Sequence, residues 1–330
     1  MELIAGLLDF CLQSANNSIR CSQIPRSILN RRYILKAEEG EKAMERKRAV
    51  VTGGSSGIGR GIVYCLAEAD YDVAFSYCSR EASAQAVCSA LKLRYPDGRF
   101  FCFQAELSES GAGPRFFRQA ANALGGVDLM VNNAGVSPKE GLLDLTEETL
   151  DHLLHLNFRA YILLMREAAR YMAAHGIQGS IVNVTSTRAD RAYPADGIYG
   201  GLKAAVNRAI KSFALDVAPY GIRINNVAPG AIQRLTDEEM SQMEEAPQRA
   251  QIEYLTPRIP LQRYGQPKDI GRAVVFLASE NASYITGETI RIDGGLALPG
   301  MPEREALSRL GWGAPDRREI SWEEEKPALP

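Results

Sequence analysis

A tyrosine and a lysine stand four residues apart near the middle of the chain, in the stretch GIYGGLKAA. If this stretch is helical, Tyr199 and Lys203 are i,i+4 neighbours and project from the same face of the helix. A phenol beside an ammonium group can move a proton, because a nearby positive charge favours the phenolate. The same spacing also occurs for a packed aromatic ring and a solvated amine on an ordinary helix, so the pair alone does not establish a site.

The pair lies in a segment where short apolar runs alternate with helical patterns. This alternation predicts an α/β fold of one domain: a Rossmann-type, doubly wound parallel sheet of about seven strands with helices on both faces. Such a sheet binds its ligand in a crevice outside the carboxyl ends of the strands. The predicted strands are 49–52, 73–75, 100–103, 129–131, 180–184, 223–227 and 289–292, and the predicted helices include 58–66, 115–124, 150–174, 199–218 and 269–278.

A glycine-rich turn, TGGSSGIG, follows the first predicted strand directly and opens a helix. Gly53, Gly57 and Gly59 would let backbone N–H groups and the helix N-terminus approach a pyrophosphate. A tight connection between a strand and a helix would need glycines as well. Polar segments also follow later strands, namely NNAG at 132–135, NVTS at 183–186 and NNVAPGAI at 225–232, and the fold would bring them to the same edge of the sheet.

These segments, in this order, resemble the short-chain dehydrogenase/reductase family over roughly residues 45–300. The resemblance implies a catalytic tetrad of Asn157, Ser186, Tyr199 and Lys203. In this tetrad Tyr199 would be the general acid/base and Ser186 would hold the substrate oxygen. Lys203 would tune the phenol and bond the nicotinamide ribose, and Asn157 would position a water for proton relay.

The same resemblance implies a nicotinamide dinucleotide cofactor. Cys78 and Ser55 occupy positions where NADP-dependent relatives often carry a basic residue. This favours NAD(H) over NADP(H), with Ser79 and Arg80 as an alternative receptor for a 2′-phosphate. Glu106 stands where the family usually has an Asp against adenine. Beside Tyr199 and Lys203, the expected cofactor contacts are Gly53, Ser55, Ser56, Gly57, Ile58, Gly59, Tyr77, Ser79, Arg80, Glu106, Leu107, Asn133, Ala134, Gly135, Pro229, Gly230 and Ile232.

The substrate is expected to contact the loop from Gln233 to about Arg263. Its apolar side chains fit an amphipathic lid over an apolar substrate, although an ordinary surface helix has the same pattern. Because the end of the domain resembles bacterial hydroxysteroid and glucose 1-dehydrogenases, we expect a steroid such as a 20-keto or 20β-hydroxysteroid. The alternatives are a sugar or polyol, a 3-oxoacyl thioester and, from another class, a non-catalytic dinucleotide-binding sensor or assembly subunit. The apolar lid residues are Leu235, Met240, Met243, Tyr254, Leu255 and Ile259.

Composition excludes several other classes of function. The 38 basic and 40 acidic residues leave a net charge of −2, which offers no field for nucleic acid or an anionic membrane. No apolar run is long enough to span a bilayer. Six cysteines without a C-x-x-C spacing and three histidines predict no metal site and a cytoplasmic protein with reduced thiols.

The chain is expected to divide into an N-terminal extension at 1–44, the catalytic domain at 45–300 and a C-terminal tail at 301–330. The extension would be either an arm that packs on a neighbouring subunit or a translated leader upstream of Met44. The family resemblance implies a homo-oligomer, most simply a homotetramer, that binds a small-molecule substrate.

Overall fold

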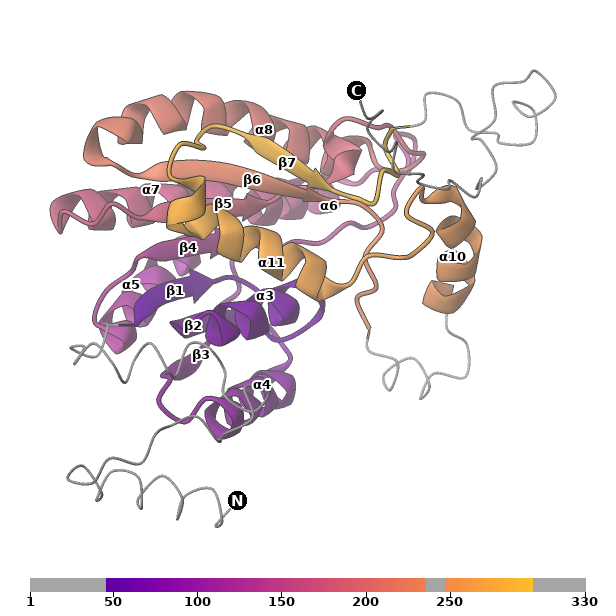
Figure 1. Cartoon of the computed structure of the whole chain (residues 1–330). Helices are drawn as coiled ribbons and strands as arrows, with labels where there is room; N and C mark the ends of the chain where they lie inside the picture. Colours follow the sequence, from indigo (N-terminus) through magenta and orange to yellow (C-terminus); the bar gives the residue numbers. More distant parts are fainter. Residues whose placement is uncertain (1–45, 236–246, 299–330) are drawn as a thin grey trace, which may run out of the picture. The chain divides into compact units, whose positions relative to one another are not determined.

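Seven parallel strands form the centre of the structure, and most of their residues are buried because helices cover both faces. The computed structural model describes residues 46–235 and 247–298 (Figure 1). The strand order is β3-β2-β1-β4-β5-β6-β7, so the chain reverses its direction of winding between β1 and β4. The strands are β1 (Lys47–Val51), β2 (Tyr71–Tyr77), β3 (Phe100–Gln104), β4 (Leu129–Asn132), β5 (Ser180–Val184), β6 (Arg223–Pro229) and β7 (Thr289–Ile292).

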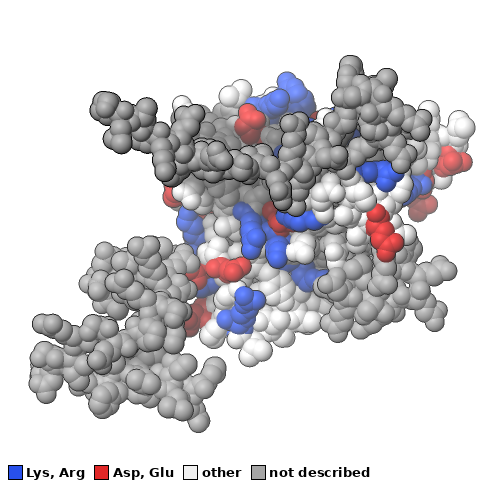
Figure 2. Space-filling view, turned by 45° about the vertical axis from the view of Figure 1, so that its right-hand side comes forward, with Lys and Arg blue, Asp and Glu red and all other residues white. Residues whose placement is uncertain are grey.

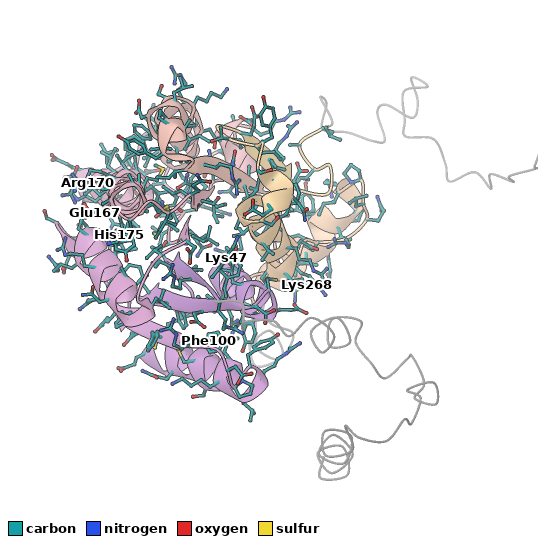
Figure 3. The ribbon with its side chains drawn as sticks, turned by 60° about the vertical axis from the view of Figure 1, so that its left-hand side comes forward. Lys47, Phe100, Glu167, Arg170, His175 and Lys268 are labelled. Atoms are coloured by element: carbon teal, nitrogen blue, oxygen red, sulfur yellow. The ribbon has the colours of Figure 1, made fainter. Side chains whose placement is uncertain are left out.

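Two sets of helices cover the two faces of this sheet. The first set is α3 (Gly57–Glu68), α4 (Glu81–Arg94) and α11 (Pro267–Ala278), and the second is α5 (Ala112–Leu124), α7 (Ala160–Ala174) and α8 (Gly197–Val217). Figure 3, which shows the amino ends of the strands, labels Lys47 at the start of β1 and Phe100 at the start of β3. Two further helices are α6 (Glu147–Leu154) and α10 (Pro247–Leu255).

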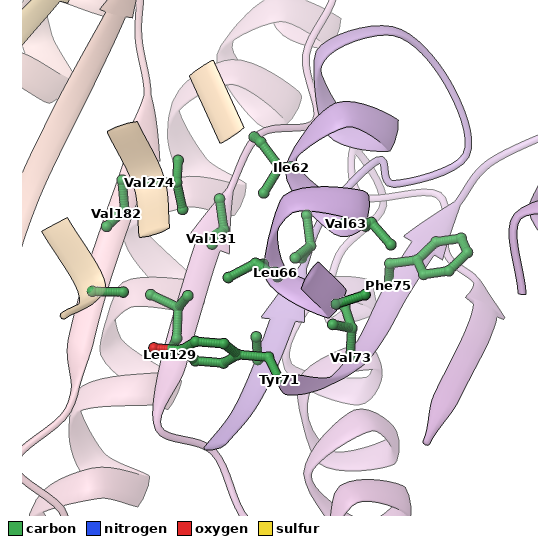
Figure 4. Close-up of a cluster of buried hydrophobic side chains, with 14 of the residues drawn as sticks. Ile62, Val63, Leu66, Tyr71, Val73, Phe75, Leu129, Val131, Val182 and Val274 are labelled. Atoms are coloured by element: carbon green, nitrogen blue, oxygen red, sulfur yellow. The ribbon is translucent and has the colours of Figure 1, made fainter. Parts of the chain in front are cut away.

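Alternating side chains of each strand belong to opposite cores, as a pleated strand requires. On β1, Val50 packs in the core with α5, α7 and α8, whereas Val51 packs in the core with α3 and α11. Figure 4 shows the core between the sheet and helices α3 and α11, where Leu66 of α3 and Val274 of α11 meet Val131 of the sheet. Burial on both faces explains why the strands read as continuous apolar runs in the sequence.

The predicted fold is confirmed, and the strands at 180–184 and 289–292 have the predicted bounds. One helix, α4, was not predicted. Its buried positions are Ala84, Val87, Cys88 and Leu91, which are mostly small and leave a weak apolar pattern. The predicted extension at 1–44 and tail at 301–330 lie outside the described residues.

A row of asparagine side chains crosses the buried sheet and ends on α8. Asn132 donates to Asn183 across 2.8 Å, Asn183 donates to Asn226 across 2.9 Å, and Asn226 donates to Asn207 of α8 across 3.0 Å. The three strand residues are in register on β4, β5 and β6 and are fully buried. Because buried amides need partners, the row fixes α8 against the sheet one helical turn beyond Lys203.

We expect Asn183→Ala to lower the free energy of unfolding by roughly 2–4 kcal/mol, because it leaves the amide of Asn132 and the carbonyl of Asn226 without their partner. Urea denaturation measures this change. Asn122→Ala, at an exposed position on α5, is the control and should change the value by less than about 0.5 kcal/mol. Equal unfolding midpoints for the two variants would contradict the role given to the row.

Candidate active site

The carboxyl ends of the strands carry the predicted site residues. The winding of the chain reverses between β1 and β4, and this is the switch point where open α/β sheets bind ligands. Figure 2 shows the face toward which these strand ends point, with basic side chains gathered near its middle. Each predicted motif follows a strand that ends on this side of the molecule: the glycine turn follows β1, and the other polar segments follow β4, β5 and β6.

The glycine turn leaves the start of α3 open to a ligand. Gly53 adopts a φ of +67°, which favours glycine, and a Cβ on Gly59 would collide with the backbone oxygen of Gly53. Ser56 is the N-cap residue of α3, but its side chain makes no capping hydrogen bond. The first N–H groups of the helix are therefore available to an anion.

The two serines of this turn differ in exposure. Ser55 is buried, whereas Ser56 is partly exposed at the helix start. The sequence analysis assigned the NADP-discriminating position to Ser55, and this assignment stays a prediction.

A threonine that the sequence analysis did not single out connects β1 to the NNAG segment. The hydroxyl of Thr52 accepts hydrogen bonds from the backbone N–H groups of Asn133, at 2.8 Å, and Ala134, at 2.9 Å. The amide of Asn133 in turn donates to the backbone oxygens of Thr52 and Gly53. These bonds fix the floor of the crevice between β1 and β4.

The end of β2 forms the outer part of the crevice. Tyr77 is buried, whereas Cys78, Ser79 and Arg80 are exposed. The Cys78 thiol donates to the Glu106 carboxylate across 2.9 Å. Hydrogen bonds from Cys78 and Ser108 hold the pKa of Glu106 below its usual value, so a negative charge is kept beside the end of β2. The neighbouring Leu107 is buried.

The segment after β6 closes the other side of the crevice. Pro229 accepts a hydrogen bond from Thr187 at 3.3 Å, and a Cβ on Gly230 would lie 2.6 Å from the Cβ of Asp293. Ile232 is buried. Two residues further on, the Cβ of Arg234 lies 3.7 Å from the position that a Cβ on Gly57 would take. Arg234 was not among the predicted cofactor contacts, but it lies over the glycine turn.

Ser186 and Tyr199 lie together at the centre of these segments. Ser186 follows β5, and its hydroxyl accepts from the backbone N–H of Arg188 at 3.2 Å. Burial raises the pKa of Tyr199, while a hydrogen bond with Ser186 and the charges of Arg188 and Arg234 act to lower it. The sequence analysis did not anticipate these two arginines, and the tuning role that it gave to Lys203 stays a prediction.

Lys203 lies beneath the phenol, on the same face of α8 as predicted. Its Nζ is 5.6 Å from the centre of the Tyr199 ring and is buried, and burial lowers the pKa of Lys203 to about 7. The ammonium group donates to the hydroxyl of Tyr161 at 3.0 Å and to the backbone oxygen of Val184 at 3.1 Å. It also lies 4.3 Å from the centre of the Tyr161 ring.

Tyr161 is thus a further residue of the site. Its side chain is 1% exposed, and its hydroxyl donates to the backbone oxygen of Val184 across 3.2 Å. Tyr161 stands four residues after Asn157, in the same long helical region, and this i,i+4 spacing was the available signal in the sequence.

Asn157 lies in a π-helical turn, His155–Arg159, between α6 and α7. Its side-chain oxygen accepts a hydrogen bond from the backbone N–H of Val136 at 3.2 Å, and its side-chain NH₂ group donates to the backbone oxygen of Val136 at 2.9 Å. A Cβ on Gly135 would collide with the Asn157 carbonyl oxygen, so this pairing needs glycine there. The side chain of Asn157 therefore holds the segment after β4, and its predicted water-positioning role stays a prediction.

The remaining predictions concern metals, membranes and the lid. In the described part of the chain no cluster of His, Cys, Asp and Glu could hold a metal ion, and no helix is long and apolar enough to cross a membrane. Ile259 is buried and packs beside Gly294, and the lid role stays a prediction. Met240 and Met243 of the predicted lid lie outside the described residues.

Comparisons with known proteins agree with this geometry. The family model described as enoyl-(acyl carrier protein) reductase matches residues 53–297. The 3-oxoacyl-[acyl-carrier-protein] reductase of Staphylococcus aureus is 34% identical over 252 residues, which are 76% of this chain and 98% of that protein. The L-rhamnose 1-dehydrogenase (NAD(P)(+)) of a Sphingomonas species is 32% identical over 255 residues, 77% of this chain and 98% of that protein. A short chain dehydrogenase from Burkholderia cenocepacia, solved in complex with NADP, superposes with a TM-score of 0.67 at 33% identity and covers 77% of this chain and 98% of its own.

We expect Tyr161→Phe to move the alkaline limb of the pH–kcat profile to lower pH by about half a unit or more. The variant keeps the ring but removes one acceptor of the Lys203 ammonium, so the pKa of Lys203, already lowered to about 7, falls further. The protonated fraction of Lys203 then falls above neutral pH, and kcat should drop more at pH 8 than at pH 6.

Tyr171→Phe, on the same helix α7 but stacked on His175, is the matched control. It should leave the pH profile in place. A loss of stability without a shift of the alkaline limb would show that Tyr161 is only a packing residue.

Proposed function

Because the chain belongs to the short-chain dehydrogenase/reductase family, and so is an NAD(P)-dependent oxidoreductase acting on CH–OH groups, we propose that Tyr199 is its general acid/base, supported by Ser186, Lys203 and Asn157. The observation that carries this proposal is the meeting of Ser186 and Tyr199 above the buried Lys203, beside a glycine turn that leaves a helix N-terminus open. The reaction interconverts a ketone and a secondary alcohol.

The crevice fits a dinucleotide. The open N-terminus of α3 and the close approach of Gly59 to Gly53 suit a pyrophosphate, and Arg234 adds a positive charge over the same turn. Glu106 and Leu107 would flank the adenine, and Asn133, Ala134 and Gly135 would line the inner ribose. Pro229, Gly230 and Ile232 would hold the nicotinamide end. When bound, the nicotinamide supplies or accepts the hydride.

The protein's own residues handle the proton. The Ser186 hydroxyl, oriented by the backbone N–H of Arg188, would bond the substrate oxygen beside the phenol of Tyr199. In the reducing direction, Tyr199 donates its proton to that oxygen, and in the oxidising direction the phenolate accepts it. Lys203 holds positive charge beneath the phenol, and Tyr161 with the Val184 carbonyl keeps it there.

The surroundings of Tyr199 favour a polar substrate. Arg188 lies beside it, Tyr193 lies beside Arg188, and the buried Asp196 pairs with Arg188. This lining suits the sugar, polyol and 3-oxoacyl alternatives better than the 20-keto steroid that the sequence analysis placed first. We therefore propose a small, polar carbonyl or carbinol compound as the substrate.

For the cofactor we propose NADH over NADPH. The charged carboxylate of Glu106, bonded to Cys78 at the end of β2, would repel a 2′-phosphate. Ser56 also supplies no positive charge at the helix start. Arg80 is the basic residue at the end of β2 that opposes this preference.

A panel of reductions monitored by nicotinamide absorbance tests both proposals. We expect turnover of sugar lactones or 3-oxoacyl compounds, with kcat/KM at least about tenfold higher for NADH than for NADPH. Turnover of a 20-keto steroid alone would overturn the polar-substrate proposal, and equal use of the two cofactors would overturn the NADH proposal. A Cys78→Arg variant should move the preference toward NADPH.

The alternative of a non-catalytic dinucleotide-binding protein predicts no turnover. The variant Tyr199→Phe tests whether turnover, where it is found, depends on the phenol while cofactor binding does not. If Tyr199 transfers the proton, this variant should lose kcat by at least about 100-fold, since general acid/base groups contribute about 10²–10⁴-fold. Binding of NADH, measured by its fluorescence, should change little. Tyr220→Phe, at an exposed position just beyond the end of α8, is the control and should keep the wild-type rate within a few fold.

On the family resemblance, we also propose a cytoplasmic homotetramer. Light scattering of the purified chain tests the oligomeric state, and the mass of a monomer would overturn the tetramer proposal.

A further inference from the structure

Within the part of the chain that the structure describes, the guanidinium group of an arginine beside the catalytic phenol is hydrogen-bonded at one end only. Arg188 follows Ser186 by two residues, and its guanidinium carbon lies 6.0 Å from the centre of the Tyr199 ring. The same carbon lies 5.3 Å from the centre of the Tyr193 ring. The side chain is 29% exposed, so it is largely enclosed but still reaches the opening.

One end of this guanidinium group is fixed by two bonds. Nη1 donates to Asp196 at 2.9 Å and to the hydroxyl of Ser137 at 3.1 Å. Asp196 is only 4% exposed, and Ser137 lies just beyond the segment that follows β4. The buried carboxylate and the two neighbouring rings fix the plane of the guanidinium.

The other edge of the group remains available. Within the described ranges, Nε and Nη2 of Arg188 have no hydrogen-bond partner, while Nη1 carries both bonds. Two parallel N–H groups along this edge match the two oxygens of a carboxylate. A preformed fork costs little side-chain entropy when an anion binds, because Asp196 and Ser137 already hold it.

The position of Arg188 relates this fork to the reaction. Ser186 and Tyr199 define where the reacting oxygen lies, and Arg188 is the first charged side chain after Ser186. Ser137, which Arg188 contacts, also lines a cavity of 490 Å³ with Val136, Pro138 and His152. The partly exposed guanidinium group of Arg188 therefore lies beside the phenol of Tyr199, near the place where Ser186 would hold the reacting oxygen.

We propose that this free edge of Arg188 binds a carboxylate of the substrate, so that the enzyme acts on oxo acids and hydroxy acids in preference to neutral ketones and alcohols. The inference rests on the proposed function, because it assigns the substrate class of the same site. Asp196 is then a positioning residue that acts through Arg188.

Rates with paired substrates test the assignment. The probes are 3-oxobutanoate and 4-oxopentanoate, each compared with its methyl ester, in reduction by NADH. We expect kcat/KM for at least one acid to exceed that of its ester by about tenfold or more, since bonds to a charged group discriminate strongly. In Arg188→Gln this ratio should fall to near one, because the acid should lose far more of its kcat/KM than the ester does.

Matched variants separate charge from geometry. Arg188→Lys keeps the charge but loses the fork and should recover only part of the ratio. Asp196→Asn should lower the ratio without abolishing ester reduction. Arg191→Gln, in the same loop but bonded to the backbone oxygen of Ala297, is the control and should keep the wild-type ratio.

Two results would overturn the proposal: equal kcat/KM for acid and ester in the wild type, or a preference for acids that survives Arg188→Gln. Calorimetric titration of the NADH-loaded protein with 3-hydroxybutanoate and its methyl ester measures the same discrimination without turnover. Failure of the proposed function would instead appear as no reduction of any acid, ester or neutral ketone, and the titration would then decide the carboxylate assignment by itself.

Discussion

The burial of one ammonium group is the constraint on which the rest of the site depends. Lys203 lies beneath the phenol of Tyr199, where burial lowers the pKa of Lys203 to about 7. A charge in such a place is tolerated only if fixed acceptors replace the lost water. The Tyr161 hydroxyl and the Val184 carbonyl are those acceptors. Helix α7, strand β5 and helix α8 must therefore meet within hydrogen-bond distance, and this meeting sets the position of Tyr199.

The polar interior of the sheet serves the same requirement. The asparagine row through Asn132, Asn183 and Asn226 ends on Asn207, one turn beyond Lys203 on α8. Apolar packing alone resists small rotations of a helix weakly, whereas a buried amide loses a hydrogen bond when the helix turns. The row thus holds the rotation of α8 that presents Tyr199 to the crevice.

The sides of the crevice that we propose for the cofactor and for the substrate are built differently. The cofactor side consists mainly of backbone groups and glycines, held by Thr52 and by the Asn157 side chain. A backbone surface suits a ligand shared by many relatives. The substrate side consists of side chains on the loop after Ser186, among them Arg188 and Tyr193. Because loops accept substitutions without disturbing the sheet, this side can differ between relatives that share one reaction.

Local patterns in the sequence were enough to determine the seven strands, their parallel arrangement and the shared helix face of Tyr199 and Lys203, because burial on both faces and i,i+4 spacing are local properties of the chain. Ser186 was expected from the family resemblance instead. The helix α4 escaped because its buried side chains are mostly small. Only the tertiary structure placed Tyr161 against Lys203, joined Arg188 to Asp196 and Ser137, and buried Ser55 while exposing Ser56. Such contacts join side chains from different elements, and they depend on strand register and helix rotation, which no periodicity along the chain records.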